Sequence, residues 1–218
     1  MVESKLTKLR RLVLMAMLAA IAYLLMAVIR IPVVLFLKYE PKDVVITIGG
    51  FLLGPMAAMV ISLVVSLVEM VSVSDTGIIG CVMNFISTCS FACTASLIYK
   101  KKHTLSGAVL GLSLGSVVMV CVMLLWNWLI TPLYLGGTRE EVAAMLLPVF
   151  LPFNALKAGF NSALVLGLYK PLTGALRKTR LLPQVSASKG NPKFGIYLFS
   201  AALLVTCILI LLVMRGIL

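Results

Sequence analysis

The sequence predicts an all-α integral membrane protein, in which a bundle of six helices with a short, sheltered second helix is followed by an additional C-terminal transmembrane helix. Hydrophobic residues make up 61% of the 218-residue chain and charged residues only 12%, whereas soluble domains are about half apolar and about a quarter charged. Several apolar runs reach the roughly 20 residues that a helix needs to cross a bilayer. Basic residues lie in short clusters between these runs, the pattern that keeps Lys and Arg in the cytoplasm.

The formal net charge of +12 has the same explanation. Nucleic-acid-binding domains gather basic residues on one face, whereas here they flank apolar runs, so we expect the lipid bilayer and no nucleic acid as a partner. All five cysteines lie inside apolar segments, and no His or acidic residue stands near Cys89 and Cys93 to complete a metal site. We therefore expect buried, apolar cysteines and no metal.

The first helix is expected at about residues 12–29, after a basic N-terminus. We expect it to be retained, because a cleaved signal peptide has a shorter apolar core and a small-residue cleavage site. Ala16 and Ala20 fall on one face, and small residues at this spacing let two helix backbones approach closely in a membrane. This face has two interpretations: packing inside the chain's own bundle, or docking of a separate membrane subunit.

A charged loop at residues 30–43 precedes an apolar stretch at residues 44–73, which is too long for one crossing and short for two. The basic clusters at the N-terminus and at residues 100–103 should both be cytoplasmic, so an even number of crossings must separate them. We therefore expect a short helix, a turn at Gly54-Pro55 and a longer helix after it. The short helix cannot span the bilayer alone and must be sheltered by protein.

The remaining apolar runs complete the topology. We expect helices at residues 77–99 and 105–130, an outer loop at 131–138, and a helix to about Tyr169 that begins with a capping box at Thr138 and Glu141 and is bent by Pro148 and Pro152. The predicted organisation is a substrate-binding membrane domain at 1–180, a cytoplasmic linker at 181–193 and an extra transmembrane helix at 194–218. This last helix is expected to be peripheral, without buried polar groups.

Polar side chains at membrane depth are functional candidates by default. Four predicted helices carry such groups in their outer halves, below the charged loop: Glu69, Asn84, Asn127, and the set Asn154, Lys157 and Asn161, which share one helix face. These groups also have plainer interpretations. Asn84 could form a hydrogen bond between helices, and Asn127 could belong to the interfacial aromatic belt. Glu69, near a helix end, could simply reach water. Lys157 lies near mid-membrane and has no carboxylate nearby on its own helix, so we expect it to face a ligand or polar cavity.

These residue types suit a neutral or weakly charged, partly aromatic solute. Asn both donates and accepts hydrogen bonds, as the edge of a heterocycle or a polyol requires, and Lys donates to a carbonyl. Flat apolar surfaces for a ring are offered by Trp126, Trp128, Tyr39, Tyr134, Phe150 and Phe153. No phosphate-binding loop and no nucleophile elbow or zinc-protease motif occurs, so we assign no catalytic residue. A membrane enzyme using Glu69, Asp75 or Lys157 stays open as an alternative.

Several segments of the chain resemble a known family. Tyr39-Glu40-Pro41-Lys42-Asp43 and Ile48-Gly49-Gly50-Phe51-Leu52-Leu53-Gly54-Pro55 resemble the first loop and second helix of riboflavin-specific S components (RibU type) of energy-coupling factor (ECF) vitamin transporters. Asn127 with Thr131-Pro132-Leu133-Tyr134, and Pro152-Phe153-Asn154 with Lys157, look like the later ligand-side segments of that family. The stripe of Ala16 and Ala20 is similar to its contact for the coupling subunit.

The resemblance implies a bacterial cell-membrane subunit, with a cytoplasmic N-terminus, that captures riboflavin, or alternatively FMN, from outside. It implies no cofactor besides this transported ligand, and as partners a membrane coupling subunit (EcfT) and two ATPase subunits. Lys157 and Asn127 would bind the polar edge of the flavin, with residues 37–43 closing over it. The expected substrate-binding residues are Leu37, Tyr39, Glu40, Asp43, Asn84, Asn127, Tyr134, Asn154, Lys157 and Asn161. There are two alternatives. The transported solute could be another vitamin, or the chain could be a scaffold that only binds partner helices.

Overall fold

The computed structural model describes residues 8–35, 37–74, 76–178 and 194–216. The chain forms, in order, α1 (Lys8–Val28), β1 (Ile31–Val34), β2 (Leu37–Tyr39), α2 (Lys42–Leu53), α3 (Pro55–Ser72), α4 (Gly77–Lys101), α5 (Leu105–Leu135), α6 (Arg139–Met145), a π-helical turn (Leu146–Phe150), α7 (Leu151–Lys178) and α8 (Phe194–Met214). Helices α1, α3, α4, α5, α8 and the continuous α6–α7 segment are each long and apolar enough to cross a membrane. The predicted fold class is confirmed.

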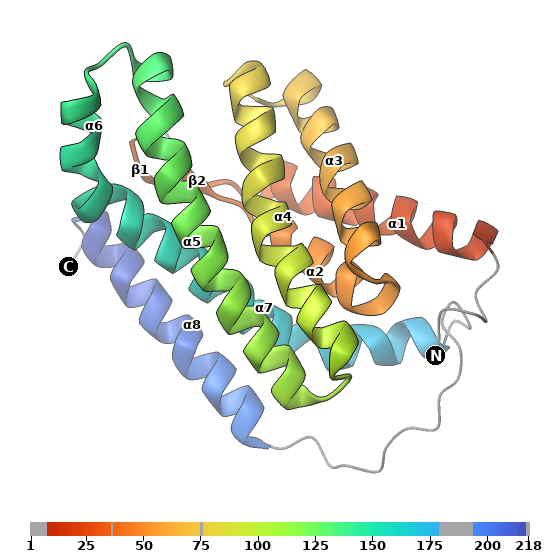
Figure 1. Cartoon of the computed structure of the whole chain (residues 1–218). Coiled ribbons are helices and arrows are strands. Elements are labelled where there is room, and N and C mark those ends of the chain that lie inside the picture. The colour runs from red at the N-terminus through yellow and green to blue at the C-terminus, as the bar shows by residue number, and fades with distance from the viewer. Residues whose placement is uncertain (1–7, 36, 75, 179–193, 217–218) are drawn as a thin grey trace.

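Helix α2 is the short, sheltered helix that the sequence predicts. Its 12 residues give a length of about 18 Å, well below the roughly 30 Å of a bilayer core. Every residue of α2 except Leu52 is buried, and the helix lies behind α3 and α4 in the middle of the bundle (Figure 1). A side chain at Gly50 would meet the Ser96 hydroxyl of α4 at 2.1 Å, so only glycine allows this close approach.

The turn after α2 is also as predicted. Gly54 adopts a positive φ of 94° and Pro55 is the first residue of α3, where a missing N–H group costs nothing. At this end, the Arg11 side chain of α1 donates to the Leu53 carbonyl at 2.9 Å. One apolar core cluster joins α1, α2 and α3 around Leu14, Leu18 and Ile61, so both ends of α2 are anchored in the bundle.

Two stretches differ from the sequence prediction. Residues 30–43 were expected as a loop, but β1 and β2 pair antiparallel within it, with Ile31 opposite Tyr39. Residues 131–135 were also expected in a loop, yet α5 continues through Pro132 to Leu135. Pro132 lies in the last turn and cannot donate a backbone hydrogen bond to the preceding turn, yet the helix ends only at Gly136, which has a left-handed φ of 71°.

The segment after α5 follows the prediction more closely. Thr138 and Glu141 form the predicted capping box, in which the Glu141 N–H donates to the Thr138 hydroxyl and the Thr138 N–H to the Glu141 carboxylate. The irregularity expected at Pro148 takes the form of the π-helical turn between α6 and α7. Helix α7 then continues beyond Tyr169, through Pro171, to Lys178.

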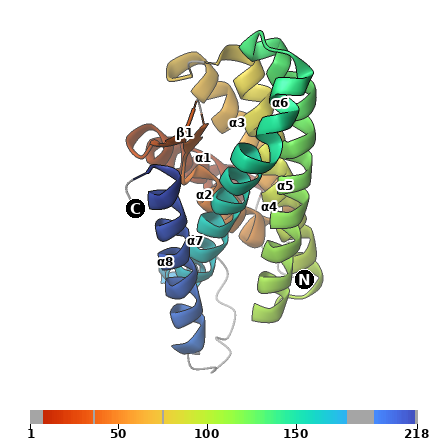
Figure 2. The same cartoon turned by 90° about the vertical axis from the view of Figure 1, so that its left-hand side faces the viewer.

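Helix α8 lies along α7 on the outside of the bundle (Figure 2). It is peripheral, as predicted, since most of its side chains are exposed. The expectation that it lacks buried polar groups is wrong, because the buried Ser200 hydroxyl donates to the Ala163 carbonyl of α7 at 2.5 Å. Residues 181–193, the predicted linker, lie outside the described residues.

Candidate functional site

The β1–β2 hairpin covers one end of the bundle. Val33, Leu37 and Tyr39 point inward and join a core cluster with Phe153 and Phe160 of α7 and with Cys207 of α8. The Tyr39 ring packs against the Phe160 ring with centroids 5.0 Å apart. These contacts hold the hairpin against the helices.

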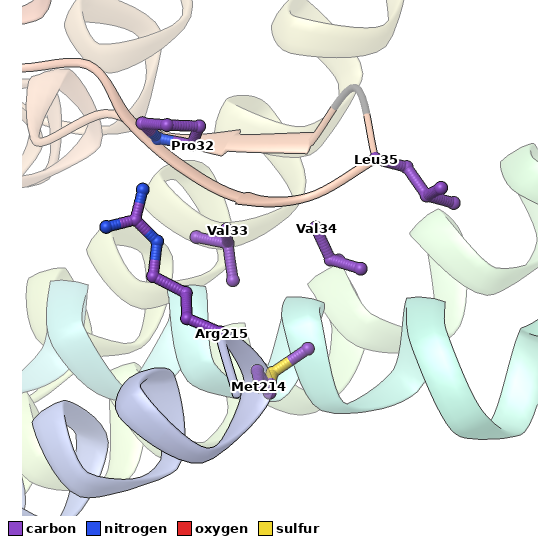
Figure 3. Close-up of a pocket in the computed structure, with 6 residues that line it drawn as sticks. All are labelled: Pro32, Val33, Val34, Leu35, Met214 and Arg215. Atoms are coloured by element: carbon purple, nitrogen blue, oxygen red, sulfur yellow. The ribbon is translucent and has the colours of Figure 1, made fainter. Parts of the chain in front are cut away.

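The far end of α8 reaches the same hairpin. Figure 3 shows Met214 and Arg215 beside residues 32–35 of the hairpin, where they line a shallow surface pocket with Pro32, Val33, Val34 and Leu35. Leu203, Leu204, Leu211 and Met214 of α8 pack on the core cluster that contains the inward face of the hairpin. Helix α8 therefore supports the hairpin from the side.

Behind the hairpin lies a first ionic cluster, formed by Arg30, Glu40, Lys42 and Glu69. Arg30 Nε contacts Glu40 Oε1 at 2.8 Å and Lys42 Nζ contacts Glu40 Oε2 at 2.7 Å. Lys42 also contacts Glu69, which in turn accepts from Asn84 Nδ2 at 2.9 Å. Burial alone would raise the pKa of Glu40, but the Lys42 ammonium and then the Arg30 guanidinium lower it below the ordinary value of a glutamate.

A second ionic cluster is centred on Asp43, which is fully buried. Asp43 Oδ1 accepts from the Thr88 hydroxyl of α4 at 2.6 Å. Asp43 Oδ2 accepts from Lys157 Nζ at 3.1 Å and from Asn161 Nδ2 at 3.2 Å, both on α7. Both carboxylate oxygens are therefore satisfied, as a buried charge requires.

A polar cavity of about 280 Å³ lies between the two clusters, the hairpin and helices α3, α4, α5 and α7. This volume is close to the lower end of the roughly 300–1,000 Å³ that is typical of small-molecule sites. Of the expected substrate-binding residues, those that line it are Leu37, Glu40, Asn84, Asn127, Asn154 and Lys157. The helices that sequence reasoning grouped together by depth are thus brought together around one space.

Three expected contacts lie behind the cavity instead of lining it. Tyr39, Asp43 and Asn161 are buried, and Asn161 links the other two: its Oδ1 accepts from the Tyr39 hydroxyl at 3.2 Å and its Nδ2 donates to Asp43 Oδ2. Their side chains are not among those that line the cavity. The Tyr134 side chain lies outside the described part of the structure.

The two lining asparagines of α5 and α7 present their amides in the same way. Asn127 Nδ2 donates to the Met123 carbonyl at 2.7 Å and Asn154 Nδ2 donates to the Phe150 carbonyl at 2.8 Å, each one turn earlier on its own helix. An amide nitrogen carries two hydrogens, so each side chain is fixed by one of them and retains a second donor. The Lys157 ammonium is similarly fixed by Asp43 and by Ser87 Oγ at 3.3 Å.

The predicted aromatic walls are largely elsewhere. Of the described aromatic candidates, Phe153 alone lines the cavity. Trp126 packs on a core cluster and Phe150 is fully buried in another. Trp128 is 40% exposed and lies beneath the Arg139 guanidinium at 5.9 Å. The apolar part of the cavity wall is instead formed by the Phe153 ring and the side chains of Met83 and Met123.

Sequence reasoning missed several lining residues and the role of Lys42. Arg30, Lys38 and Ser87 line the cavity. Lys42, expected within the charged loop at residues 30–43, is 1% exposed in the first turn of α2. The available signal was the alternation of basic and acidic residues from Arg30 to Asp43, directly before a helix that had to be sheltered. No group of three or more His, Cys, Asp or Glu side chains is placed to hold a metal within the described residues.

Ala16 and Ala20 are exposed, on the side of α1 away from its buried residues Leu14, Leu18 and Ala22. The described bundle therefore makes no use of this small-residue face for its own packing.

A polar cavity inside a bundle of membrane-spanning helices, covered by a hairpin, defines a solute-binding membrane protein. Residues 10–169 match the family described as "ECF transporter, substrate-specific component". Because this match covers more than half of the chain, the chain belongs to that family of transporter subunits. Membership of a transporter family decides against the membrane-enzyme alternative.

Individual relatives agree with the family. The riboflavin transporter RibU of Staphylococcus aureus is 29% identical over 78% of this chain and 93% of its own length. The riboflavin transporter FmnP of Bacillus subtilis is 29% identical over 69% of this chain and 85% of its own length. RibU of Lactococcus lactis is 30% identical over 74% of this chain and 92% of its own length. A solved structure of the S component of a bacterial ECF transporter matches with a TM-score of 0.67 and 28% identity, over 78% of this chain and 99% of that chain.

The first ionic cluster predicts the consequence of removing Lys42. The substitution Lys42→Met leaves the Glu40 and Glu69 carboxylates with Arg30 in place of two shared cations, and breaking a buried ion pair costs about 3–5 kcal/mol. We expect a markedly lower midpoint of thermal unfolding in detergent. The matched control is Lys101→Met at an exposed helix end, which should leave the midpoint unchanged. Equal midpoints for the two variants would contradict a role of the cluster in stability.

Proposed function

We propose that this chain binds riboflavin in the cavity beneath the hairpin and delivers it to the other subunits of an ECF transporter. The observation that carries the proposal is the convergence of Asn127, Asn154 and Lys157 on one covered cavity, in a chain whose relatives are named riboflavin transporters. Donors and acceptors fixed in place around a small apolar wall are the means by which a pocket orients a heterocycle.

In this proposal the polar edge of the isoalloxazine ring meets the second amide hydrogens of Asn127 and Asn154 and the remaining N–H of Lys157. Phe153, Met83 and Met123 form the apolar surface for the ring, since thioethers and aromatic rings pack well together. Leu37 and Glu40 close the cavity from the hairpin side. Tyr39, Asp43 and Asn161 act from behind the cavity, and Asn84 acts at its edge through Glu69.

The ion pairs of the two clusters favour a neutral solute. Lys157 is paired with Asp43, and Lys42 and Arg30 are paired with Glu40 and Glu69. A phosphate ester such as FMN would bring added negative charge beside the Glu40 and Glu69 carboxylates. We therefore rank riboflavin above FMN as the ligand.

The proposed partners are a membrane coupling subunit (EcfT) and two ATPase subunits. The exposed face of α1 that carries Ala16 and Ala20 is the proposed contact for the coupling subunit, because small residues let a partner helix come close. The chain contains no phosphate-binding loop, which supports ATP hydrolysis by separate subunits.

We also propose the orientation of the chain in the cell membrane. The basic N-terminus and the exposed lysines of the α4–α5 turn would lie in the cytoplasm, by the bias of Lys and Arg toward that side. The hairpin and cavity would then face outward, residues 181–193 would form a cytoplasmic linker between the membrane domain (1–180) and the segment 194–218, and α8 would end outside.

The ligand is tested by titrating the detergent-purified protein with riboflavin and following flavin fluorescence. We expect quenching on binding, and Asn127→Ala to weaken affinity about tenfold through the loss of one hydrogen bond. Ser113→Ala, at an exposed residue of the same helix, is the control and should bind normally. FMN, thiamin, biotin and pyridoxine are titrated in parallel. If the protein binds no riboflavin, the proposed ligand is wrong. If it instead binds another of these vitamins tightly, that vitamin is the ligand.

The coupling surface is tested with Ala16→Trp and Ala20→Trp. The bulky ring should hold a partner helix away from α1 and reduce riboflavin uptake by cells about tenfold or more, while purified protein still binds riboflavin. Val205→Trp, at a 56% exposed position of α8, controls for the added ring. Normal riboflavin uptake by both tryptophan variants, Ala16→Trp and Ala20→Trp, would exclude this face of α1 as the contact.

The orientation is tested by cysteine labelling in intact cells with a membrane-impermeant maleimide, relative to the unsubstituted chain. Leu35→Cys, at a 64% exposed position of the hairpin, should be labelled directly. Lys101→Cys, at the opposite end of the bundle, should be labelled only after the membrane is permeabilised. The reverse pattern would invert the proposed topology.

A further inference from the structure

Asp43 connects three helices and the hairpin without lining the cavity. Its carboxylate accepts hydrogen bonds from Thr88 of α4 and from Lys157 and Asn161 of α7, while its own backbone carbonyl accepts from the Thr47 hydroxyl at 2.6 Å. Among these residues, Lys157 is the one that also lines the cavity. The position of Asp43 therefore determines where a cavity-lining ammonium can lie.

Lys157 is a side chain that needs such a partner. A lysine side chain has a flexible four-carbon stem that can adopt many rotamers, and its compact charge lies at the far end. Here its ammonium is held between Asp43 Oδ2 at 3.1 Å and Ser87 Oγ at 3.3 Å. An ammonium has three N–H groups, so these two contacts aim the third and reduce the conformational entropy that binding a solute would otherwise cost.

The same carboxylate is linked to the hairpin. The Tyr39 hydroxyl of β2 donates to Asn161 Oδ1 at 3.2 Å, and Asn161 Nδ2 donates to Asp43 Oδ2 at 3.2 Å. Burial, and then the charge of Asp43, raise the pKa of Tyr39, so its hydroxyl keeps the proton it donates. A continuous chain of contacts thus runs from the hairpin through Asn161 and Asp43 to the ammonium in the cavity.

We propose that Asp43 is a positioning residue for Lys157, and that the Tyr39–Asn161 link makes the position of the Lys157 ammonium depend on the hairpin being seated on the bundle. This deepens the proposed function and, for its effect on affinity, rests on it. Seating of the hairpin then does two things together: it covers the cavity and completes the hydrogen-bond set that aims Lys157. A solute would meet an ordered donor only in the covered state.

The test uses variants that keep the ion pair, because Asp43→Asn would strand the Lys157 charge and can fail to fold. Tyr39→Phe removes only the hydroxyl and keeps the ring that packs on Phe160. Thr88→Val keeps the shape of the side chain and removes one donor to Asp43. Both are prepared in the wild-type chain and in an Asp43→Asn, Lys157→Met background, which removes both charges of the pair together and so strands neither.

The first readout needs no ligand. In protein labelled with ¹⁵N at lysine Nζ, ammonium groups held in buried ion pairs give protected signals, and we expect them for Lys157 and for Lys42, each assigned by its Lys→Met variant. Tyr39→Phe and Thr88→Val should shift or broaden the Lys157 signal and leave that of Lys42 unchanged. An unaltered Lys157 signal in both variants overturns the positioning role, whether or not riboflavin binds.

The second readout is riboflavin affinity in a double-mutant cycle. If Tyr39 acts through Asp43 and Lys157, Tyr39→Phe should weaken binding about fivefold to tenfold in the wild-type chain, as expected for one hydrogen bond in a charged network. It should have no further effect in the Asp43→Asn, Lys157→Met background. Equal losses in both backgrounds mean that Tyr39 acts independently and overturn the link. If the wild-type chain binds no riboflavin, the proposed ligand fails, and the ammonium signals still decide the positioning role.

Discussion

The placement of the whole site depends on the pairing of buried charges at the first turn of α2. Removing a charge from water costs several kcal/mol unless the charge is paired and hydrogen-bonded. This protein buries two charges on adjacent residues, Lys42 and Asp43. Lys42 pairs with Glu69 on α3, while Asp43 pairs with Lys157 on α7 and with Thr88 on α4. Because neighbouring residues of one helix point in different directions, these pairs fix the start of α2 against three other helices at once.

The cavity follows from this arrangement. Helix α2 is too short to cross the membrane and begins just after the hairpin, so the space beside its first turn is enclosed by longer helices and covered by β1 and β2. The other end of α2 is held by Arg11 of α1, close in sequence to the exposed Ala16 and Ala20. One buried helix therefore joins the polar site to the helix whose outer face we propose as the contact for the coupling subunit.

Helix α8 adds a feature beyond the family pattern. The family match ends at residue 169, and α8 begins at Phe194. It packs on α7 through Ser200 and Cys207, and its last turn reaches the hairpin. The hairpin of this chain is thus supported on its apolar side by a helix that comes from outside the matched region, and on its polar side by the two ionic clusters.

The sequence by itself determined the membrane class, the sheltered α2 with its Gly54–Pro55 turn, and the helices on which Asn127, Asn154 and Lys157 lie, because run length and charge clustering are local properties. It could not decide partners, which depend on how each helix is rotated about its axis. Lys157 lacks a carboxylate on its own helix, and only the tertiary structure brought Asp43 to it from α2. The same packing turned Tyr39 and Asn161 behind the cavity and left Ala16 and Ala20 exposed, since long-range contacts, and not spacing along the chain, select which face of a helix is buried.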